Sequence, residues 1–371
     1  MGDPHGPSGR AIKAPRILVV GAGASGLAFA LECASRGTHV RVIERRSCRS
    51  SIQKATGVAA GVWRRLSKFG VSPTSVSAAI PMRNFAFHDD GRLVANVPVP
   101  EIDGEPPAHL YPQGELERYL EEALSSRGVE VEYDTAFISY EASGTSVRVG
   151  IRDEGQEVER TEEFDWVVGA DGAHSAVRQA AGMPFVGRDY PETWSVAEIS
   201  TRKWPSDAQA QLFLRSDGVG LFLSQPTSGV VQGILNAPNV SKALHAHFPD
   251  AELRYERDFR VTLRRVRSPR TGRVWLIGDA AHVQSPVGGQ GLNLAIWDGI
   301  TLAEGLLAGD LTVERVLARR ARTVLLFTDF DYRMLATKSR LVRSVRNRYW
   351  AYAAKHPALA RWFFKLISGG W

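Results

Sequence analysis

The segment Arg16–Arg45 constrains the fold of this 371-residue chain more than any other stretch. Its apolar run Ile17–Val20 leads directly into Gly21-x-Gly23-x-x-Gly26. A short apolar run that meets a glycine-rich turn predicts a buried parallel strand, a tight turn and a helix. Gly21 permits the turn, Gly23 lets a pyrophosphate approach the backbone, and Gly26 lets the helix lie close to the strand.

The rest of this segment completes the pattern. A predicted helix, Leu27–Arg36, ends at Gly37, and a second apolar strand, Val40–Ile43, leads to Glu44, eighteen positions after Gly26. The helix N-terminus offers free N–H groups to phosphates, and the acid offers acceptors to ribose hydroxyls. An isolated glycine pattern also fits an ordinary turn, but strand, helix, second strand and acid together favour a dinucleotide site.

A second motif follows the predicted strand Trp166–Gly169. Asp171 and Gly172 stand where that strand ends, and Ser175 and Arg178 begin a helix. Ligands bind at the carboxyl ends of strands in open α/β sheets, so Asp171 is a candidate contact. The same residues also fit a plain strand-to-helix turn with an N-capping Asp or Ser.

The third motif is the most specific one in the chain. The apolar strand Val274–Ile277 precedes Gly278-Asp-Ala-Ala-His282 and the glycine-rich loop Pro286–Asn293. The acid Asp279 suits the polyol or ribose of a cofactor, and a glycine turn that opens a helix presents N–H groups to an electron-rich ring edge. A catalytically silent glycine loop is the alternative.

Together, the three motifs resemble the class A, aromatic-hydroxylase-type FAD-dependent monooxygenases, over roughly Arg16–Leu307. The resemblance implies that Glu44 holds the adenosine ribose, Asp279 the ribityl chain, and the loop Pro286–Asn293 the isoalloxazine ring. Lys54 falls where many members carry an Arg near the flavin. The cofactor-binding residues that the resemblance implies are Gly21, Gly23, Ala24, Ser25, Gly26, Glu44, Arg45, Gln113, Asp171, Arg178, Asp279, Pro286, Gly289, Gly291, Leu292 and Asn293.

The resemblance also implies the chemistry. NAD(P)H would reduce FAD, O2 would add at the flavin C4a, and the C4a-hydroperoxyflavin would hydroxylate or epoxidise a hydrophobic or aromatic small molecule, as in secondary metabolism. Because the chain has one GxGxxG, NAD(P)H would bind transiently in a shared groove. A flavin-dependent oxidase or reductase of the same fold, and a binding protein with a vestigial nucleotide site, remain alternatives.

No side chain is identified as a catalyst. If the substrate is a phenol, His245 or His247 are conceivable bases, although two solvent-facing loop histidines are the simpler interpretation. His174 and His282 belong to the second and third motifs and are expected to be structural. The two cysteines have no ligand neighbours at metal-binding spacing, so no metal site is expected.

The expected fold class is α/β, with a Rossmann-like FAD-binding domain interleaved with a mostly antiparallel substrate domain and followed by C-terminal helices. Between the motifs, a helix is expected over residues 55–70, a hairpin near 84–100 and a helix over Tyr111–Leu124. The expected boundaries are a disordered leader, 1–15; an FAD-binding domain, 16–79, 108–190 and 263–311; a substrate domain, 80–107 and 191–262; and a basic helical segment, 312–371.

Charge is uneven along the chain. Nine Lys and Arg and no acidic residue follow Asp331, so the residues up to that point carry a net charge of −3 within a total of +6. One apolar helical face is predicted in this tail, made of Leu335, Leu341, Val342, Val345 and Tyr349. Residues 333–371 are therefore a candidate for peripheral contact with an anionic bilayer, with packing of that face onto the enzyme as the alternative.

The remaining features concern the location and partners of the protein. Two cysteines suit a reducing cytoplasm, and no apolar run has the length of a membrane span. The N-terminal residues lack the apolar core of a signal peptide. No nucleic-acid recognition motif accompanies the basic tail, so no nucleic-acid partner is expected.

Overall fold

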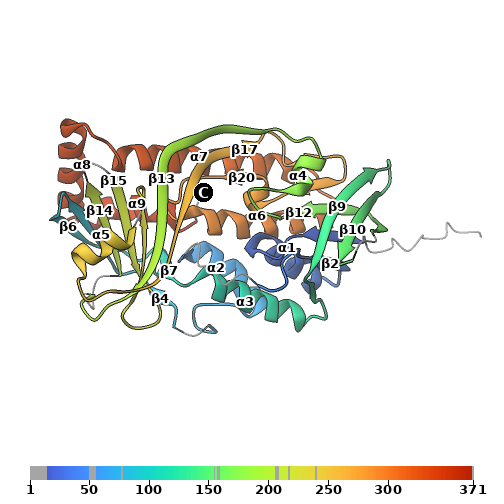
Figure 1. Ribbon diagram of the computed structural model, residues 1–371, viewed down its shortest axis with the longest axis horizontal. Helices are drawn as coiled ribbons and strands as arrows, with labels where there is room; N and C mark the ends of the chain where they lie inside the picture. Colours follow the sequence, from blue (N-terminus) through green and yellow to red (C-terminus); the bar gives the residue numbers. More distant parts are fainter. Residues whose placement is uncertain are drawn as a thin grey trace, which may run out of the picture.

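The computed structural model describes residues 15–49, 56–76, 78–153, 155–156, 159–204, 209–215, 218–238 and 240–369. Figure 1 shows the first helix and its parallel sheet at one end of the molecule and the sheet that carries β14 and β15 at the other. The predicted leader falls almost entirely outside the described residues, as does Lys54.

A six-stranded sheet forms the first layer, in the order β18-β19-β12-β1-β2-β8. Neighbouring strands are parallel except for β18, which pairs antiparallel at the edge. The apolar runs that precede the three motifs supply the adjacent strands β1, β12 and β19, and every residue of β1 is buried. The strands are β1 (Ile17–Val20), β2 (Val40–Ile43), β8 (Val131–Glu132), β12 (Trp166–Gly169), β18 (Arg270–Thr271) and β19 (Val274–Leu276).

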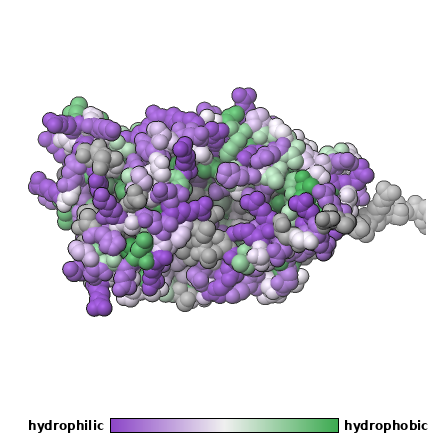
Figure 2. Space-filling view, in the orientation of Figure 1, coloured by the Kyte–Doolittle hydropathy of each residue, from purple (hydrophilic) through white to green (hydrophobic). Residues whose placement is uncertain are grey.

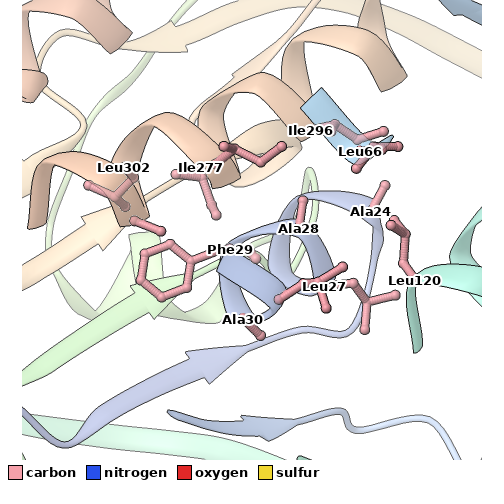
Figure 3. Close-up of a cluster of buried hydrophobic side chains, with 14 of the residues drawn as sticks. Ala24, Leu27, Ala28, Phe29, Ala30, Leu66, Leu120, Ile277, Ile296 and Leu302 are labelled. Carbon is pink, nitrogen blue, oxygen red and sulfur yellow. The ribbon is translucent and has the colours of Figure 1, made fainter. Parts of the chain in front are cut away.

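Helices cover one face of this sheet. Figure 3 shows α1 (Ala24–Ser35) packed against α6 (Gln290–Leu307), with apolar side chains between them. The approach of the two helices requires glycine at position 299, since a Cβ there would lie 2.4 Å from the carbonyl oxygen of Ser25 on α1. Gly26 in turn lets α1 lie close to β1, because a Cβ on it would lie 2.1 Å from the carbonyl oxygen of Gly21. The other face packs on a three-stranded antiparallel sheet made of β9 (Thr135–Ala142), β10 (Val147–Asp153) and β11 (Arg160–Phe164).

The second layer is an eight-stranded sheet, mostly antiparallel, in the order β20-β17-β13-β16-β15-β14-β5-β6. The predicted hairpin supplies β5 (Asn84–Asp89) and β6 (Arg92–Pro98), and β5 pairs parallel with β14. The other strands are β13 (Phe185–Ser200), β14 (Ala210–Arg215), β15 (Gly218–Ser224), β16 (Val230–Leu235), β17 (Glu252–Val266) and β20 (His282–Val283).

Two local predictions need correction. The segment expected to be one helix over residues 55–70 begins as a strand, β3 (Gly57–Ala59), before α2 (Ala60–Leu66). β3 forms a small sheet with β7 (Ala108–Leu110) and β4 (Ile80–Pro81), and this tertiary pairing overrides the helical spacing of Val58. The histidine segment is also not a loop, since it forms the helix α5 (Val240–His247).

Four further helices are α3 (Gln113–Ser125), which packs on the first layer, α7 (Val313–Leu335), and the tail helices α8 (Arg340–Ala353) and α9 (Pro357–Ile367). The buried Trp350 and Phe364 join the tail helices to the core of the second layer. Figure 2 shows a largely hydrophilic face with scattered hydrophobic side chains.

The hypothesis that the predicted apolar face packs onto the enzyme is wrong for α8. Leu341 is 74% exposed and Val345 58% exposed, while the side chain of Arg346 is buried. Arg343 and Arg346 instead pair with the carboxylate of Asp89 on β5, at 2.9 and 3.1 Å. Two arginines therefore anchor α8 to the sheet, and the apolar stripe faces outward.

Candidate functional site

The three sequence motifs line a single cavity of about 780 Å³. Gly23, Asp171 and Asp279 lie at the ends of different parallel strands and all three face this space. Of the sixteen predicted cofactor-binding residues, all but Gly26 and Arg178 line it. Segments far apart in sequence thus form one continuous wall, as the carboxyl edge of a parallel sheet requires.

Glu44 closes the first motif. Its Oε2 accepts the N–H of Ala22 at 3.1 Å, and its Oε1 accepts the backbone and side-chain N–H groups of Arg46, both at 3.0 Å. Burial opposes ionisation of this carboxyl, but the hydrogen bonds from Arg46 and Ala22 outweigh it and lower the pKa of Glu44 below its usual range. The carboxylate is therefore charged and rigidly placed beside the cavity.

Glu117 on α3 is a cavity residue that the sequence analysis missed. Its Oε1 accepts the N–H of Ala24 at 3.1 Å and the side-chain N–H of Gln113 at 2.8 Å. The signal was present, because Gln113 was recognised and a residue four positions later lies on the same helical face. Glu117 links α3 to the first turn of α1 at the predicted phosphate site.

Asp171 serves partly as a helix cap, the alternative considered from the sequence. Its Oδ2 accepts the N–H groups of Ala176 and Val177 at 2.7 and 3.1 Å, at the start of α4 (Ala176–Ala180). Its Oδ1 is buried and has no hydrogen-bond partner among the described residues. Burial raises the pKa of Asp171 despite the hydrogen bonds of the cap. The Asp171 side chain therefore caps α4 with one carboxylate oxygen and leaves the other without a partner in the cavity wall.

Arg178 stands behind the wall. Its guanidinium donates to the carbonyl oxygen of Ala280 at 2.9 Å and to that of Ala173 at 2.8 Å, and it stacks over the ring of Phe185 at 3.9 Å. These contacts tie the second motif to the third. In this structure the side chain positions two loops and does not itself face the cavity.

The third motif presents a helix N-terminus to the cavity. Gly289 adopts a left-handed conformation and caps α6 without a side-chain hydrogen bond, which leaves the first N–H groups of an 18-residue helix available. The Asn293 side chain accepts the N–H of Ala59 at 2.8 Å and donates to the carbonyl oxygens of Gly57 and Gly289. This side chain holds the glycine loop against β3.

His282 has the structural role expected for it. Its Nε2 lies 2.5 Å from Oδ2 of Asp298, both side chains are buried, and the same oxygen accepts the N–H of Gly278. Burial disfavours the imidazolium, yet the neighbouring carboxylate of Asp298 outweighs it and raises the pKa of His282. The pair fixes the turn that carries Asp279.

Beyond the glycine loop the cavity becomes apolar. The second-layer sheet, which comes from the predicted substrate domain, lines one side of this part. Helices α7, α8 and α9, which were not predicted to contribute, close it. The side chains of this chamber include Met82, Phe85, Phe87, Trp194, Leu212, Leu223, Ile234, Phe259, Val261, Leu335, Trp350, Phe363 and Ile367. Asp331 lies among them.

Of the two conceivable histidine bases, His245 does not line this cavity. His245 is exposed on α5 and its Nδ1 contacts the carbonyl oxygen of Ser241, and the side chain of His247 lies outside the described residues. His174 is exposed at the cavity rim. Among the described residues, no cluster of His, Cys, Asp and Glu is suited to a metal ion.

The residues present fit a dinucleotide cofactor. The turn at Gly21 leaves no room for a side chain, since a Cβ there would lie 2.5 Å from the carbonyl oxygen of Ala170. Two helix N-termini, the charged Glu44 and the unpartnered oxygen of Asp171 supply matched donors and acceptors along the cavity. Its volume lies within the usual range for cofactor and ligand sites.

The FAD binding domain family model matches residues 15–235 and 235–310 of this chain. A 6-hydroxy-3-succinoylpyridine 3-monooxygenase, HspB, from Pseudomonas putida is 31% identical over 78% of the chain and 79% of that protein. The 6-methylpretetramide 4-monooxygenase of Streptomyces rimosus is 28% identical over 78% and 55%. The pentachlorophenol 4-monooxygenase of Sphingobium chlorophenolicum is 26% identical over 77% and 57%, so the chain spans just over half the length of these two relatives.

Among solved structures, p-nitrophenol 4-monooxygenase PnpA from Pseudomonas putida superimposes with a TM-score of 0.86 over 96% of this chain and 98% of that one, at 22% identity. The flavin-dependent monooxygenase PieE, solved in complex with FAD and substrate, has a TM-score of 0.79 over 96% and 72%, at 18% identity. At these identities the likeness is one of fold.

Proposed function

This chain belongs to the FAD-binding family of class A, aromatic-hydroxylase-type monooxygenases, and we propose that it is itself an FAD-dependent monooxygenase that consumes NAD(P)H and O2 to oxidise a hydrophobic aromatic small molecule. The observation that carries the proposal is the single cavity, whose polar half suits the cofactor and whose apolar half suits the substrate. When bound, FAD would supply the redox chemistry, taking electrons from NAD(P)H and activating O2 for hydroxylation or epoxidation.

The chain's own residues would then position and protect the reactants. Glu44 and Asp279 would accept hydrogen bonds from cofactor hydroxyls, and the first N–H groups of α6 would face an electron-rich ring edge. The positive end of that helix favours negative charge in its vicinity, as in a reduced flavin. The aromatic chamber would keep water away from the reacting atoms.

NAD(P)H would bind only transiently. The chain has one GxGxxG, so a second nucleotide would use the same groove as the substrate or the cofactor. In the FAD-loaded protein we expect NAD(P)H to be oxidised faster when the substrate is present than when it is absent.

The experiment is a turnover assay of FAD-loaded protein with aromatic candidates under isotopically labelled O2. Incorporation of labelled oxygen into the product together with substrate-stimulated NAD(P)H oxidation supports monooxygenation. A flavin-dependent oxidase or reductase is the alternative, and it would give an oxidised or reduced product without label. Protein that binds no added FAD would contradict both.

A peripheral membrane contact is the second proposal, and the outward stripe of α8 favours it. Leu341, Val345, Tyr349 and Tyr352 are exposed along one face, with Arg340 and Arg348 beside them. Such a face suits the surface of an anionic bilayer.

Among the described residues, no helix has the length and apolar character needed to cross a membrane. The proposed location is the cytoplasmic side, where the free Cys48 would stay reduced.

Vesicle flotation tests this contact. Removing residues 333–371 would also remove the core side chains Trp350 and Phe364, so the triple variant Leu341→Ser, Val345→Ser and Tyr349→Ser is the cleaner comparison. We expect wild-type protein to float with vesicles containing anionic lipid and the variant to remain in solution. If the variant floats with the vesicles to the same extent as the wild-type protein, the proposed membrane contact is wrong.

A further inference from the structure

Asp331 is an ionisable side chain placed at the junction of the two halves of the cavity. It lies in the last turns of α7, and a Cβ built on Gly288 would lie 3.7 Å from its Oδ2. Gly288 belongs to the loop that opens α6, where the cofactor ring is expected. The carboxyl group therefore borders both that loop and the apolar chamber lined by Phe87, Trp194 and Leu335.

No described residue gives this carboxyl a hydrogen bond or an ion pair. Its neighbour on the helix, Asp329, is engaged by Arg188, Tyr190 and Arg333. The other charged side chain that lines the chamber from the sheet, Arg260 on β17, is exposed. The Asp331 carboxyl group thus lies in the chamber without a hydrogen bond or an ion pair to any described residue.

A half-buried carboxyl with no protein partner must be satisfied by water in the cavity or by a ligand that displaces that water. Burial alone raises the pKa of Asp331 to about 7. A carboxylate with that basicity is a much better proton acceptor at neutral pH than an ordinary aspartate, because general bases work best when their pKa lies near the working pH. The location and the chemistry of the group therefore agree.

We propose that Asp331 is the general base that faces the substrate, and that the substrate presents an aromatic hydroxyl group to it. The hydroxyl donates a hydrogen bond to a carboxylate oxygen and then transfers its proton to that oxygen. The substrate is left as the more electron-rich aryloxide, and the proton returns to solvent when product leaves. This inference rests on the proposed function, since an aryloxide ring is the better target for oxygen transfer.

A hydroxyl suits this site better than a cationic group. A permanent cation would lose its hydration between apolar and aromatic walls, and a single half-buried carboxylate offsets that cost only in part. The chamber walls are apolar and aromatic, which suits a flat ring that carries one polar substituent. The hydroxyl group would give the carboxyl a hydrogen-bond donor that no described residue supplies.

Binding measurements on FAD-loaded protein test the proposal without relying on turnover. The probes are matched sets of one- to three-ring aromatics that carry a hydroxyl, its methyl ether or an aminomethyl group, measured by calorimetry. We expect wild-type protein to bind hydroxylated members about tenfold or more tightly than their methyl ethers, and Asp331→Leu to lose this difference. Asp329→Asn, on the same helix but outside the cavity, is the control and should keep it.

Asp331→Asn separates a base from a hydrogen-bond acceptor. The amide oxygen still accepts a hydrogen bond but cannot take the proton, so we expect affinity within a few-fold of wild type, a kcat lower by roughly 100-fold or more, and recovery in Asp331→Glu. A wild-type protein that binds no hydroxylated probe, or prefers the aminomethyl compounds, would overturn the inference. So would an unchanged hydroxyl preference in Asp331→Leu.

Failure of the inference and failure of the proposed function can be told apart. A hydroxyl preference that depends on Asp331, without incorporation of labelled oxygen, would leave the binding site in place and reject monooxygenation. Incorporation of labelled oxygen without any hydroxyl preference would reject the role of Asp331 and retain the monooxygenase.

Discussion

The free-energy cost of keeping Asp331 unpaired leads to a stability prediction. In the unfolded chain this carboxyl ionises near pH 4, whereas in the folded protein it keeps its proton until about pH 7. The folded state therefore binds more protons between these pH values, and the free energy of unfolding falls as pH rises through this window. Asp331→Asn has no proton to lose. Its stability relative to wild type should increase across the same window.

The magnitude follows from the shift. A displacement of the pKa from 3.8 to about 7, at about 1.4 kcal/mol for each unit, corresponds to about 4 kcal/mol above pH 7. Because the side chain is only half-buried and meets solvent in the cavity, we reduce this to roughly 2 kcal/mol. Below pH 4 the advantage of the variant should be absent.

Denaturant unfolding of both proteins at a fixed excess of FAD, from pH 4 to pH 8, measures this difference. Asp329→Asn serves as a control of opposite sign. Burial of Asp329 opposes its ionisation, but Tyr190 and Arg188 outweigh it and lower the pKa, so this variant should lose stability above pH 4. A stability difference for Asp331→Asn that does not change with pH, or that falls as pH rises, would refute the reasoning.

Gly26→Ala should destabilise the fold by about 3 kcal/mol or more and abolish FAD retention, because its Cβ would lie 2.1 Å from a backbone oxygen; a normal melting temperature would contradict this. Glu44→Gln should weaken FAD binding about tenfold, since it loses the charged acceptor held by Arg46; fluorescence titration measures the affinity, and an unchanged value would exclude a contribution of Glu44 to FAD binding. Phe364→Ala should cost about 3–5 kcal/mol in denaturant unfolding, because this tail side chain is fully buried, whereas the exposed Trp362→Ala should be nearly neutral.

The sequence predicted the elements that carry the motifs because their signals are local. The apolar run of β1, the glycine turn after it and the acid at the end of β2 each follow from a few neighbouring residues. Their convergence could also be predicted, since parallel strands place their carboxyl ends on one edge. The strand β3 could not, because its pairing with β7 joins Val58 to His109 across fifty residues.

The substrate half could be predicted only in part, because its contacts are long-range. The alternating sheet was recognised, but nothing in the tail indicated that Trp350 and Phe363 would close the chamber. Hydrophobic spacing identified the α8 stripe but left open whether it packs onto the enzyme or faces outward. The decisive contacts are those of Arg343 and Arg346 with Asp89, more than 250 positions away in sequence, and no local pattern announces such a pair.

The two long strands that pass between the layers have a mechanical consequence. β13 and β17 are 16 and 15 residues long and pair antiparallel along most of their length. They form a long two-stranded ribbon that connects the two ends of the molecule. A hinge motion of the two ends about the cavity would break backbone hydrogen bonds between these two strands. We therefore expect no large hinge motion when the cofactor binds, and X-ray scattering profiles with and without FAD should superimpose.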